Sequence, residues 1–403
     1  MTSSENYPEL ILRPGSERTP LNGHPWIFSG AVTRHPDAAA PGTLVDVLGS
    51  QGRFVGRGFY NPKAEIAVRL LGRDRKRPID QAFLHERIKR AVALRHTSRL
   101  SDYTNAYRLV HGENDGLPGL VADYYDGFLV VQFHTCGMEL LRPIVLDALW
   151  DIVQPKGLYE RSDVGTRQAE GLADRPTGVL RGEAPPQLIP IQEHGAQLFV
   201  NIYRGQKTGY FLDQRANRHM LQQYAQGQNV LNCFAYTGGF SAHALRGGAR
   251  RTLDVDIAPQ GVPTARRNLA ANQQTDVPSD YILANVFSFL DELAQRGPRF
   301  DIVVLDPPAL LRRRKDLKQA MGVYTKLNRN ALRLIRSGGL LVTASCSGRV
   351  SQEDFFQIVR RASAGAGIDS RVLAYNQHAA DHPVDAAFPE GRYLKCVFAR
   401  VFR

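Results

Sequence analysis

The stretch "NVLNCFAYTGGFSAHALRGGARRTLDVDI", residues 229 to 257, decides the fold class. An apolar strand at its start is followed by a helix that opens at Gly238-Gly239, and a second apolar strand ends at Asp256. Farther along the chain, "YILA", "FDIVVLD" and "GLLVTASC" have the pattern of further strands, with helical segments between them. Strands that alternate with helices in this way predict a mostly parallel, doubly wound α/β sheet.

The carboxy-terminal end of the chain departs from that alternation. Two strand-like runs, near 370–376 and 393–402, are separated by a long loop instead of a helix, which predicts an antiparallel pair that closes the sheet. Before them, Ser351 with Asp354 forms a capping box, which predicts the start of the helix "SQEDFFQIVRRA".

The amino-terminal half has a different pattern. Residues 42–72 contain three strand-like runs and predict a small β-barrel that ends near residue 74, followed by the charged linker "RDRKRP". A β-rich region with one preceding amphipathic helix comes next, in which Asp126-Gly127 is a hairpin signal. Residues 172–190 are rich in Pro and Gly and predict a connecting loop or a second boundary. We therefore expect three domains, over 1–74, 75–192 and 193–403.

The bulk composition limits the partners and the compartment. Lys and Arg outnumber Asp and Glu by 51 to 39 in 403 residues, a formal charge of +12 that suits a polyanionic partner such as nucleic acid or an anionic membrane surface. There is no secretory signal pattern and no apolar run long enough for a membrane span, so we expect a cytoplasmic protein. The four cysteines are far apart, which indicates reduced thiols and neither a zinc site nor disulfides.

Three strand ends predict a nucleoside-cofactor site. Gly238 and Gly239 let a ligand approach the backbone where a helix start offers amide donors. Asp256 lies 18 residues beyond Gly238, where its carboxylate can accept both ribose hydroxyls. The third strand leads to Asn285 and Val286, where an adenine edge could be read. Together these residues fit S-adenosylmethionine as well as a dinucleotide.

The fourth strand, "FDIVVLDPPAL", favours S-adenosylmethionine. Asp306-Pro307-Pro308 sits where the fourth strand of a nucleic-acid methyltransferase meets the methyl donor, and the two prolines make the loop rigid. Many methyltransferases that act on exocyclic amino groups have an aromatic residue after this motif. Here Ala309 and Leu310 follow it, which argues against amino-group chemistry.

Cys346 ends the next strand, between two serines. A cysteine at the end of a core strand is more often a packing residue than a nucleophile. At the carboxyl end of a parallel strand, however, a thiol can face a substrate. Addition of a thiolate at carbon 6 of a pyrimidine makes carbon 5 nucleophilic enough to take a methyl group. Asp306, hydrogen-bonded at the ring nitrogen of cytosine, would assist that addition if it carried a proton.

These residues together resemble a known family, the class I S-adenosylmethionine-dependent methyltransferases that form 5-methylcytosine in large-subunit ribosomal RNA. The resemblance covers nearly the whole chain and is carried by "GFYNPKAEIAVRLL", "HGENDGLPGL", "GQKTGYFLDQRANR", "LNCFAYTGGFS", "LDPP", "SCSG" and "HPVDAAFPEGRYLKC". It implies a PUA domain, a β-rich middle domain and a Rossmann-like methyltransferase domain, with Cys346 as the nucleophile. It also implies a cofactor pocket lined by Phe211, Asp213, Gln214, Arg215, Phe234, Tyr236, Thr237, Gly238, Gly239, Asp256, Asn285 and Asp306.

The chain departs from the family pattern at two places. The family usually has a basic residue and an aromatic residue after Asp-Pro-Pro, where this chain has Ala309-Leu310. It also often has Asp where Asn285 stands, although an amide can still contact adenine.

The resemblance also gives the basic excess a use. Large-subunit ribosomal RNA, or an assembling subunit, would be the partner, and a homodimer is possible. Lys207 and Arg215 flank the predicted site, and the run Arg312, Arg313, Arg314 and Lys315 follows Asp-Pro-Pro, where it could hold RNA phosphates. The alternative for each of these cations is a solvated loop.

Three functions stay open at this point. The first is an RNA cytosine carbon-5 methyltransferase with Cys346 as nucleophile. The second is a guanine or adenine amino-group methyltransferase that uses Asp306-Pro307-Pro308, with Cys346 structural. The third is a ribosome-assembly RNA-binding protein with a vestigial catalytic fold, against which the glycine turn, Asp256 and Asp306 argue.

Overall fold

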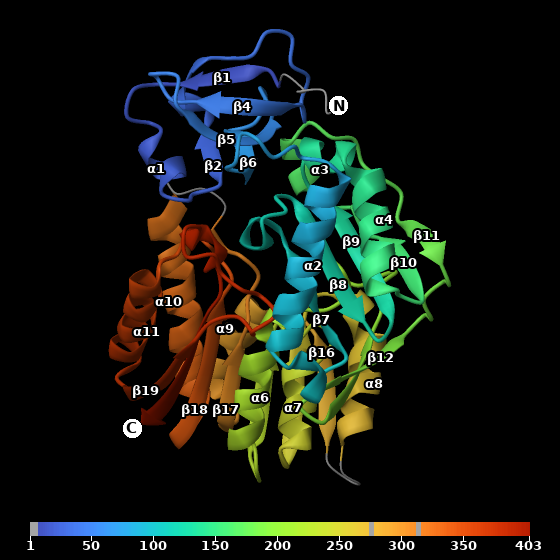
Figure 1. Ribbon diagram of the computed structural model, residues 1–403. Coiled ribbons are helices and arrows are strands. Elements are labelled where there is room, and N and C mark those ends of the chain that lie inside the picture. The colour runs from blue at the N-terminus through green and yellow to red at the C-terminus, as the bar shows by residue number, and fades with distance from the viewer. Residues whose placement is uncertain (1–6, 274–277, 312–315) are drawn as a thin grey trace.

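A six-stranded mixed sheet forms the amino-terminal part of the computed structural model, which describes residues 7–273, 278–311 and 316–403 (Figure 1). Its strand order is β2-β6-β5-β4-β1-β3, and apolar side chains such as Leu10, Val47 and Val68 fill its core. Its elements are β1 (Glu9–Leu12), α1 (Arg18–Leu21), β2 (Trp26–Phe28), β3 (Val32–Arg34), β4 (Leu44–Leu48), β5 (Phe54–Tyr60) and β6 (Ile66–Gly72). The three strands expected within 42–72 are β4, β5 and β6.

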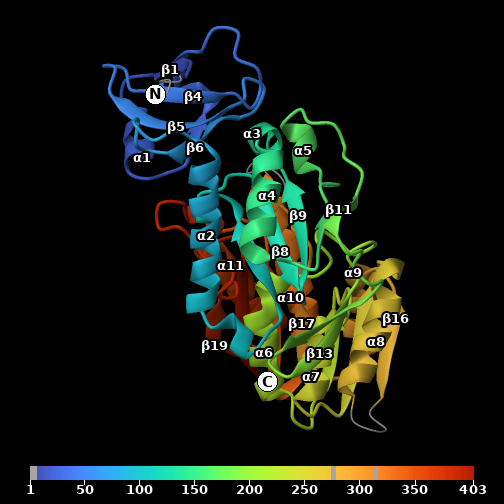
Figure 2. The same cartoon turned by 45° about the vertical axis from the view of Figure 1, so that its right-hand side comes forward.

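A five-stranded sheet with the order β11-β10-β9-β8-β7 follows along the chain. Helices α2 and α4 pack on one of its faces through Phe83, Ile88 and Leu149, and α2 runs down from the amino-terminal sheet beside it (Figures 1 and 2). The elements are α2 (Gln81–Thr97), β7 (Ala106–His111), β8 (Leu120–Tyr125), β9 (Phe128–Phe133), α3 (Cys136–Leu140), α4 (Arg142–Val153), β10 (Gly157–Glu160), α5 (Thr166–Ala169) and β11 (Gly178–Gly182).

The hairpin predicted at Asp126-Gly127 is confirmed. Both residues have positive φ, 45° and 96°, which matches the right-handed twist of the antiparallel strands β8 and β9 that they join. The segment 172–190 differs from the expected loop, because it contains β11, an edge strand antiparallel to β10. This strand is short, lies between prolines and leaves Val179 exposed, so the sequence carries little of the alternation that marks a strand.

The remaining chain forms a hairpin and a seven-stranded sheet with the order β16-β15-β14-β17-β18-β20-β19. The first five strands of this order are parallel, and β20 is antiparallel to both of its neighbours, as the sequence predicted. The strands are β12 (Ile189–Glu193) and β13 (Ala196–Val200) of the hairpin, then β14 (Asn229–Cys233), β15 (Arg251–Asp256), β16 (Ser279–Leu283), β17 (Phe300–Leu305), β18 (Ile335–Ser345), β19 (Asp369–Asn376) and β20 (Lys395–Phe402).

Helices cover both faces of this sheet. Those of one face, α6, α7 and α8, pack in sequence on the side of Val230 and Val304, whereas α9, α10 and α11 cover the side of Leu231 and Val303. Their bounds are α6 (Arg215–Tyr224), α7 (Gly239–Arg246), α8 (Val262–Asn272), α9 (Val286–Arg296), α10 (Leu317–Leu334) and α11 (Gln352–Ala366). Within the described residues, no helix is both long and apolar enough to cross a membrane.

The order in which strands join the sheet changes direction at β14. The chain adds β15 and then β16 on one side of β14, and it then returns to add β17 on the other side. In open α/β sheets, ligands bind at such a reversal, outside the carboxyl ends of the strands. The loops that follow β14, β15, β17 and β18 meet there, and they carry the residues predicted from the sequence.

Candidate active site

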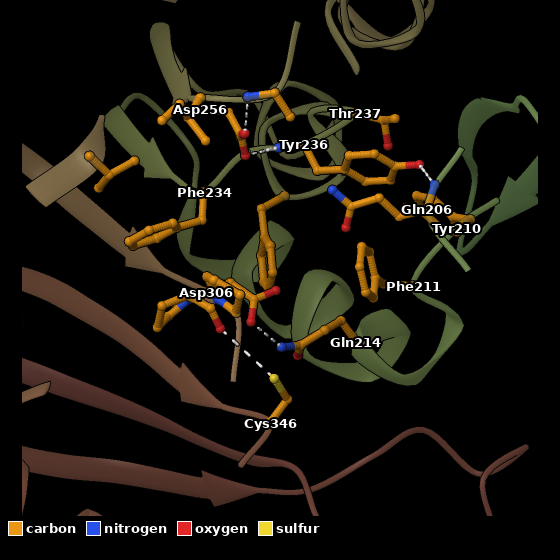
Figure 3. Close-up of a pocket in the computed structure, with 18 of the residues that line it drawn as sticks. Gln206, Tyr210, Phe211, Gln214, Phe234, Tyr236, Thr237, Asp256, Asp306 and Cys346 are labelled. Carbon is orange, nitrogen blue, oxygen red and sulfur yellow. Dashed lines mark hydrogen bonds between the residues drawn. The ribbon is translucent and has the colours of Figure 1, made fainter. Parts of the chain in front are cut away.

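A cavity opens at the carboxyl ends of β14, β15, β17 and β18 (Figure 3). It brings together residues as far apart in sequence as Gln206 and Leu394, because the loop before α6 faces the ends of the strands. Of the residues predicted from the sequence, those that line it are Lys207, Phe211, Asp213, Gln214, Phe234, Tyr236, Thr237, Gly239, Asp256, Asn285, Asp306 and Cys346.

The glycine turn after β14 shapes one wall of the cavity. Gly238 has a φ of 70° and caps α7, and a Cβ at Gly239 would lie 2.6 Å from the hydroxyl oxygen of Tyr210. Thr237 is buried on the same wall, and its hydroxyl has no hydrogen-bond partner within the described part of the chain. An unpaired buried donor beside the start of a helix suits the carboxylate at the amino-acid end of S-adenosylmethionine.

Asp256 and Asn285 lie at the end of the cavity where the sequence predicted the nucleoside. Backbone amides of Tyr236 and Ala258 donate to the two carboxylate oxygens of Asp256, at 2.9 and 2.8 Å, and fix its orientation at the end of β15. Its remaining lone pairs can accept the two ribose hydroxyls. The Asn285 oxygen caps α9 by accepting from the Phe287 amide at 2.9 Å, which leaves the Asn285 NH₂ group for an adenine edge.

Aromatic rings and a tyrosine hydroxyl complete the cofactor end. Phe234 and Phe287 meet edge to face at 5.6 Å, as do Phe211 and Tyr236 at 5.4 Å. The Tyr236 hydroxyl donates to the carbonyl of Gly209 and accepts from the amide of Gln206, so it ties the loop before α6 to the glycine turn. The residues present therefore fit S-adenosylmethionine at this end of the cavity.

Asp306 follows β17, toward the other end. Its carboxyl accepts a hydrogen bond from Gln214 Nε2 at 2.9 Å (Figure 3). Burial, and then the negative charge of Asp213, raises the pKa of Asp306 to about 7. A carboxyl in this condition can carry a proton at neutral pH and donate it to a ring nitrogen.

Cys346 follows β18, the neighbour of β17. The serines on both sides of it are turned away, because the hydroxyls of Ser345 and Ser347 both bond to the hydroxyl of Tyr324, at 3.0 and 3.2 Å. The thiol instead points into the cavity and lies 3.9 Å from the carbonyl oxygen of Pro307. Burial, and then the charge of Asp306, raises the pKa of Cys346 to about 11.

Lys207 is the basic residue of this end of the cavity. Its ammonium lies 4.8 Å from the centre of the Phe211 ring, and its charge lowers the pKa values of Asp213, Asp306 and Cys346 against other effects. The sequence predicted that Lys207 contacts RNA. Lys207 is exposed and also lines the cavity that contains Cys346, and its contact with RNA stays a prediction.

Arg215 is placed elsewhere than the sequence suggested. Its side chain is fully buried, pairs with Asp381 at 2.9 Å and with Glu193 at 3.5 Å, and is not among the residues that line the cavity. Its guanidinium is therefore engaged by two buried carboxylates, away from the cavity lining. Gly238 also lies behind the cavity wall, where it sets the turn. The predicted RNA contacts at Arg312, Arg313, Arg314 and Lys315 lie outside the described residues.

The sequence did not single out several residues that hold the site. Tyr393 donates from its hydroxyl to Asp213 at 2.7 Å, and Lys395 donates to the backbone carbonyls of Ser347, Val350 and Tyr393 at 2.6 to 2.9 Å. Both residues belong to "HPVDAAFPEGRYLKC", which carried the family resemblance. No local pattern shows that this segment crosses the sheet to reach the loop that contains Cys346.

Comparisons with known proteins agree with this arrangement. A family model described as a PUA-like domain matches residues 10–73, and one described as an S-adenosylmethionine-dependent methyltransferase matches residues 108–366. Two curated relatives, both named "Ribosomal RNA large subunit methyltransferase I", are 40% identical to this chain. The relative from Salmonella arizonae aligns over 396 residues, 98% of each chain, and that from Salmonella schwarzengrund over 403 residues, 100% of each.

Solved structures share the fold over the whole chain. A protein assigned as a methyltransferase, complexed with SAH, has a TM-score of 0.84 at 22% identity, over 97% of this chain and 99% of that one. A Streptococcus mutans protein assigned as a SAM-dependent methyltransferase has a TM-score of 0.83 at 23% identity with the same coverage. The chain therefore belongs to the S-adenosylmethionine-dependent methyltransferase family that carries an amino-terminal PUA-like domain and includes the ribosomal RNA large subunit methyltransferase I proteins.

Proposed function

We propose that this enzyme methylates carbon 5 of a cytosine in large-subunit ribosomal RNA through a covalent bond between Cys346 and carbon 6. One observation supports this choice above the others. Cys346 and Asp306 end neighbouring parallel strands and face the same cavity, and the pKa of Asp306 is raised to about 7. A nucleophile and an acid are thus available together beside the cofactor end of the cavity.

The residues divide the reaction between them. S-adenosylmethionine supplies an electrophilic methyl group when bound. The Cys346 thiolate forms a bond to carbon 6, and the electrons of the carbon 5–carbon 6 double bond shift through carbon 4 to the ring nitrogen N3, where Asp306 delivers its proton. Carbon 5 then has the reactivity of an enamine and takes the methyl group. Lys207 favours the thiolate form of Cys346.

Three observations support RNA of the large subunit as the substrate. The curated relatives bear the name of ribosomal RNA large subunit methyltransferases over the full length of the chain. A PUA-like domain precedes the catalytic part, and the chain carries a formal charge of +12, which suits a phosphate backbone. The cytoplasm follows as the compartment in which this substrate is found.

Amino-group methylation is the second candidate, and the segment after Pro308 disfavours it. Ala309 is exposed, and Leu310 packs against the hydrophobic core between the sheet and α10. Neither side chain offers the aromatic face on which a flipped base would stack. Mapping the methylated atom by mass spectrometry separates the two chemistries.

The deciding experiment compares wild-type enzyme with Cys346→Ala on large-subunit ribosomal RNA from cells that lack the enzyme, with tritiated S-adenosylmethionine. We expect the wild type to label carbon 5 of cytosine. We expect Cys346→Ala to lose at least about 10³-fold in rate, because among the described residues that line the cavity Cys346 supplies the only thiol. Full activity in Cys346→Ala would instead make the cysteine structural and favour amino-group methylation.

A binding measurement accompanies this comparison and serves as its control. Calorimetry should show that Cys346→Ala binds S-adenosylmethionine as the wild type does, because the thiol lies at the far end of the cavity from Asp256 and Asn285. Absence of cofactor binding in the wild type would favour a non-catalytic assembly factor.

A further inference from the structure

The proposed reaction requires one proton transfer to which no residue has yet been assigned. Carbon 5 takes the methyl group from the cofactor side, so its hydrogen is pushed to the opposite face of the ring. A base must remove that hydrogen before the bond to Cys346 can break. Cys346 is then bonded to carbon 6, and Asp306 is engaged at the ring nitrogen, so neither residue is available for this step.

Asp213 lies where such a base is needed. It belongs to a single turn of 3₁₀ helix, Leu212–Gln214, just before α6, and it lines the same cavity as Cys346 and Asp306. Its neighbour Gln214 donates to Asp306 at 2.9 Å, so the same short turn carries Asp213 and the residue that holds Asp306.

The support of Asp213 places it on the Cys346 side of the cavity. The Tyr393 hydroxyl donates to Asp213 Oδ2 at 2.7 Å, and Tyr393 comes two residues before β20. In the sheet, β20 lies next to β18, on the side away from the cofactor strands β14, β15 and β16. A carboxylate hydrogen-bonded to this segment is thus held from the side of the sheet away from the cofactor strands, which suits a base that must approach a target ring opposite the methyl donor.

The second oxygen of this carboxyl has no partner. Asp213 Oδ1 makes no hydrogen bond within the described residues, although the residue is only 6% exposed. Buried carboxylate oxygens are nearly always paired, so an open acceptor in a cavity points to a ligand or to a proton in transit.

The surroundings of the two carboxyls set them to opposite protonation states. Burial would raise the pKa of Asp213, but Lys207, His382, Tyr393 and Arg108 outweigh burial and hold that pKa below its usual range. The pKa of Asp306 is raised to about 7, in part by the charge of Asp213. Two carboxyls that are driven apart in this way are suited to act as acid and base.

We propose that Asp213 is the general base that removes the proton from carbon 5 of the methylated cytosine. The bond between carbon 5 and hydrogen breaks, and the proton goes to Asp213 Oδ1. The electron pair forms the double bond between carbon 5 and carbon 6, and the bond from carbon 6 to sulfur breaks with its pair returning to Cys346. Asp306 recovers the proton that it gave to the ring nitrogen. This inference rests on the proposed function.

The test uses Asp213→Asn, which keeps the shape of the side chain but removes its basicity. The substrate is large-subunit ribosomal RNA labelled with tritium at carbon 5 of cytosine, and the cofactor carries a ¹⁴C methyl group. We expect wild-type enzyme to release one tritium for each methyl transferred. We expect Asp213→Asn to transfer the methyl group but to retain the tritium, so that a doubly labelled protein–RNA adduct survives denaturation. Tritium release should fall by about 100-fold or more.

Two results would overturn the assignment. One is tritium release by Asp213→Asn at close to the wild-type rate. The other is a variant that binds S-adenosylmethionine normally but forms neither adduct nor product, which would place Asp213 earlier in the reaction. Failure of the proposed function is distinguishable, because the wild type itself would then release no tritium. Asp256→Asn is the matched control among the cavity carboxylates, and it should weaken cofactor binding without trapping an adduct.

A second variant, Tyr393→Phe, tests the base through its pKa. Loss of the hydrogen bond raises the pKa of Asp213, so the acid limb of adduct breakdown should move to higher pH than in the wild type. The other titratable groups that interact with Asp213 are Lys207 before it, Arg108 of β7, Asp306 after β17, Cys346 after β18, and His378 and His382 before β20. Tyr393→Phe leaves all of them in place, and an unshifted limb would contradict the assignment.

Discussion

The thiol of Cys346 is held in its protonated form by the resting enzyme. Its pKa of about 11 follows from burial and from Asp306, and Lys207 opposes the rise. Because only the thiolate reacts with iodoacetamide, we expect the alkylation rate at Cys346 to increase about tenfold for each pH unit up to about pH 11. Mass spectrometry of the Cys346 peptide measures this rate apart from the three buried cysteines.

Two variants give the direction of each electrostatic effect. Asp306→Asn removes the negative charge that raises the pKa of the thiol, so alkylation at pH 8 should become several-fold faster. Lys207→Gln removes the opposing cation and should make alkylation slower. An alkylation rate that is independent of pH near neutrality would contradict this account, because it would mean a thiolate already formed in the resting enzyme.

Sequence patterns predict which residues lie at this site better than they predict the role of each residue. Cys346, Asp306 and Asp256 lie at the ends of strands. A strand end can be recognised from a short stretch of sequence, so the sequence alone predicts that all three lie at one edge of a sheet. Arg215 is next to such residues in sequence but turns inward to Asp381. The Tyr393–Asp213 contact joins positions 180 residues apart, and no local pattern encodes it.

At the scale of elements, one lysine of β20 holds the turn that carries Cys346. All three hydrogens of the Lys395 ammonium go to backbone carbonyls, two of which lie between β18 and α11. We expect Lys395→Met to lower kcat more than tenfold while cofactor affinity stays within about twofold, because the turn loses its anchors and the cofactor end does not. Buried carbonyls left unpaired should reduce the free energy of unfolding by about 3 kcal/mol. Kinetics and chemical denaturation measure the two effects.

The matched control for this prediction lies at the other end of the same turn. Ser351 and Asp354 form the capping box predicted from the sequence, with reciprocal bonds that start α11. Ser351→Ala should cost about 1 kcal/mol of stability and leave kcat within about twofold. If Lys395→Met behaved in the same way as Ser351→Ala, the lysine would stabilise the fold without positioning the thiol.

Local chemistry also explains which elements could be foreseen. The capping box and the Asp126-Gly127 turn each depend on a few adjacent residues, so the sequence contains the whole signal. The edge strand β11 forms because β10 has an unpaired edge with which it can pair. Apolar and polar residues alternate too little within β11 for the sequence to predict a strand there. Local sequence patterns do not show which distant segment a strand will pair with.

At the scale of the molecule, the loop between β19 and β20 links the seven-stranded sheet to the six-stranded and five-stranded sheets. Its Asp381 pairs with Arg215 of α6 and accepts the backbone amide of Arg108 of β7, while its carbonyl accepts from Arg95 of α2. The same loop packs Phe388 against Trp26 of the amino-terminal sheet, with ring centres 4.7 Å apart. The loop thereby fixes the position of Tyr393 and of the site relative to the rest of the chain.

The buried carboxylate of Asp381 makes this junction sensitive to acid. Burial would raise its pKa, but Arg215 and His382 outweigh burial and hold the pKa far below its usual range. A group whose pKa is lower in the folded state contributes stability above its unfolded pKa of about 4, and that contribution is lost as the pH falls further. We therefore expect Asp381→Asn to destabilise the protein most at neutral pH, where it leaves the buried Arg215 with only the more distant carboxylate of Glu193 as an ionic partner.

Breaking a buried ion pair from one side costs about 3 to 5 kcal/mol, so the melting temperature of Asp381→Asn at pH 7 should fall by about 5 °C. Asp280→Asn is the matched control, because Asp280 pairs with Arg251 on the surface, and its loss should shift the melting temperature by about 2 °C or less. Scanning calorimetry between pH 7 and pH 3 measures both variants beside the wild type. The gap between wild type and Asp381→Asn should narrow below about pH 4, since the unfolded wild-type chain then takes up a proton at Asp381, whereas the variant has no carboxyl at this position. A gap that stays constant down to pH 3 would mean that the loop is held by packing alone.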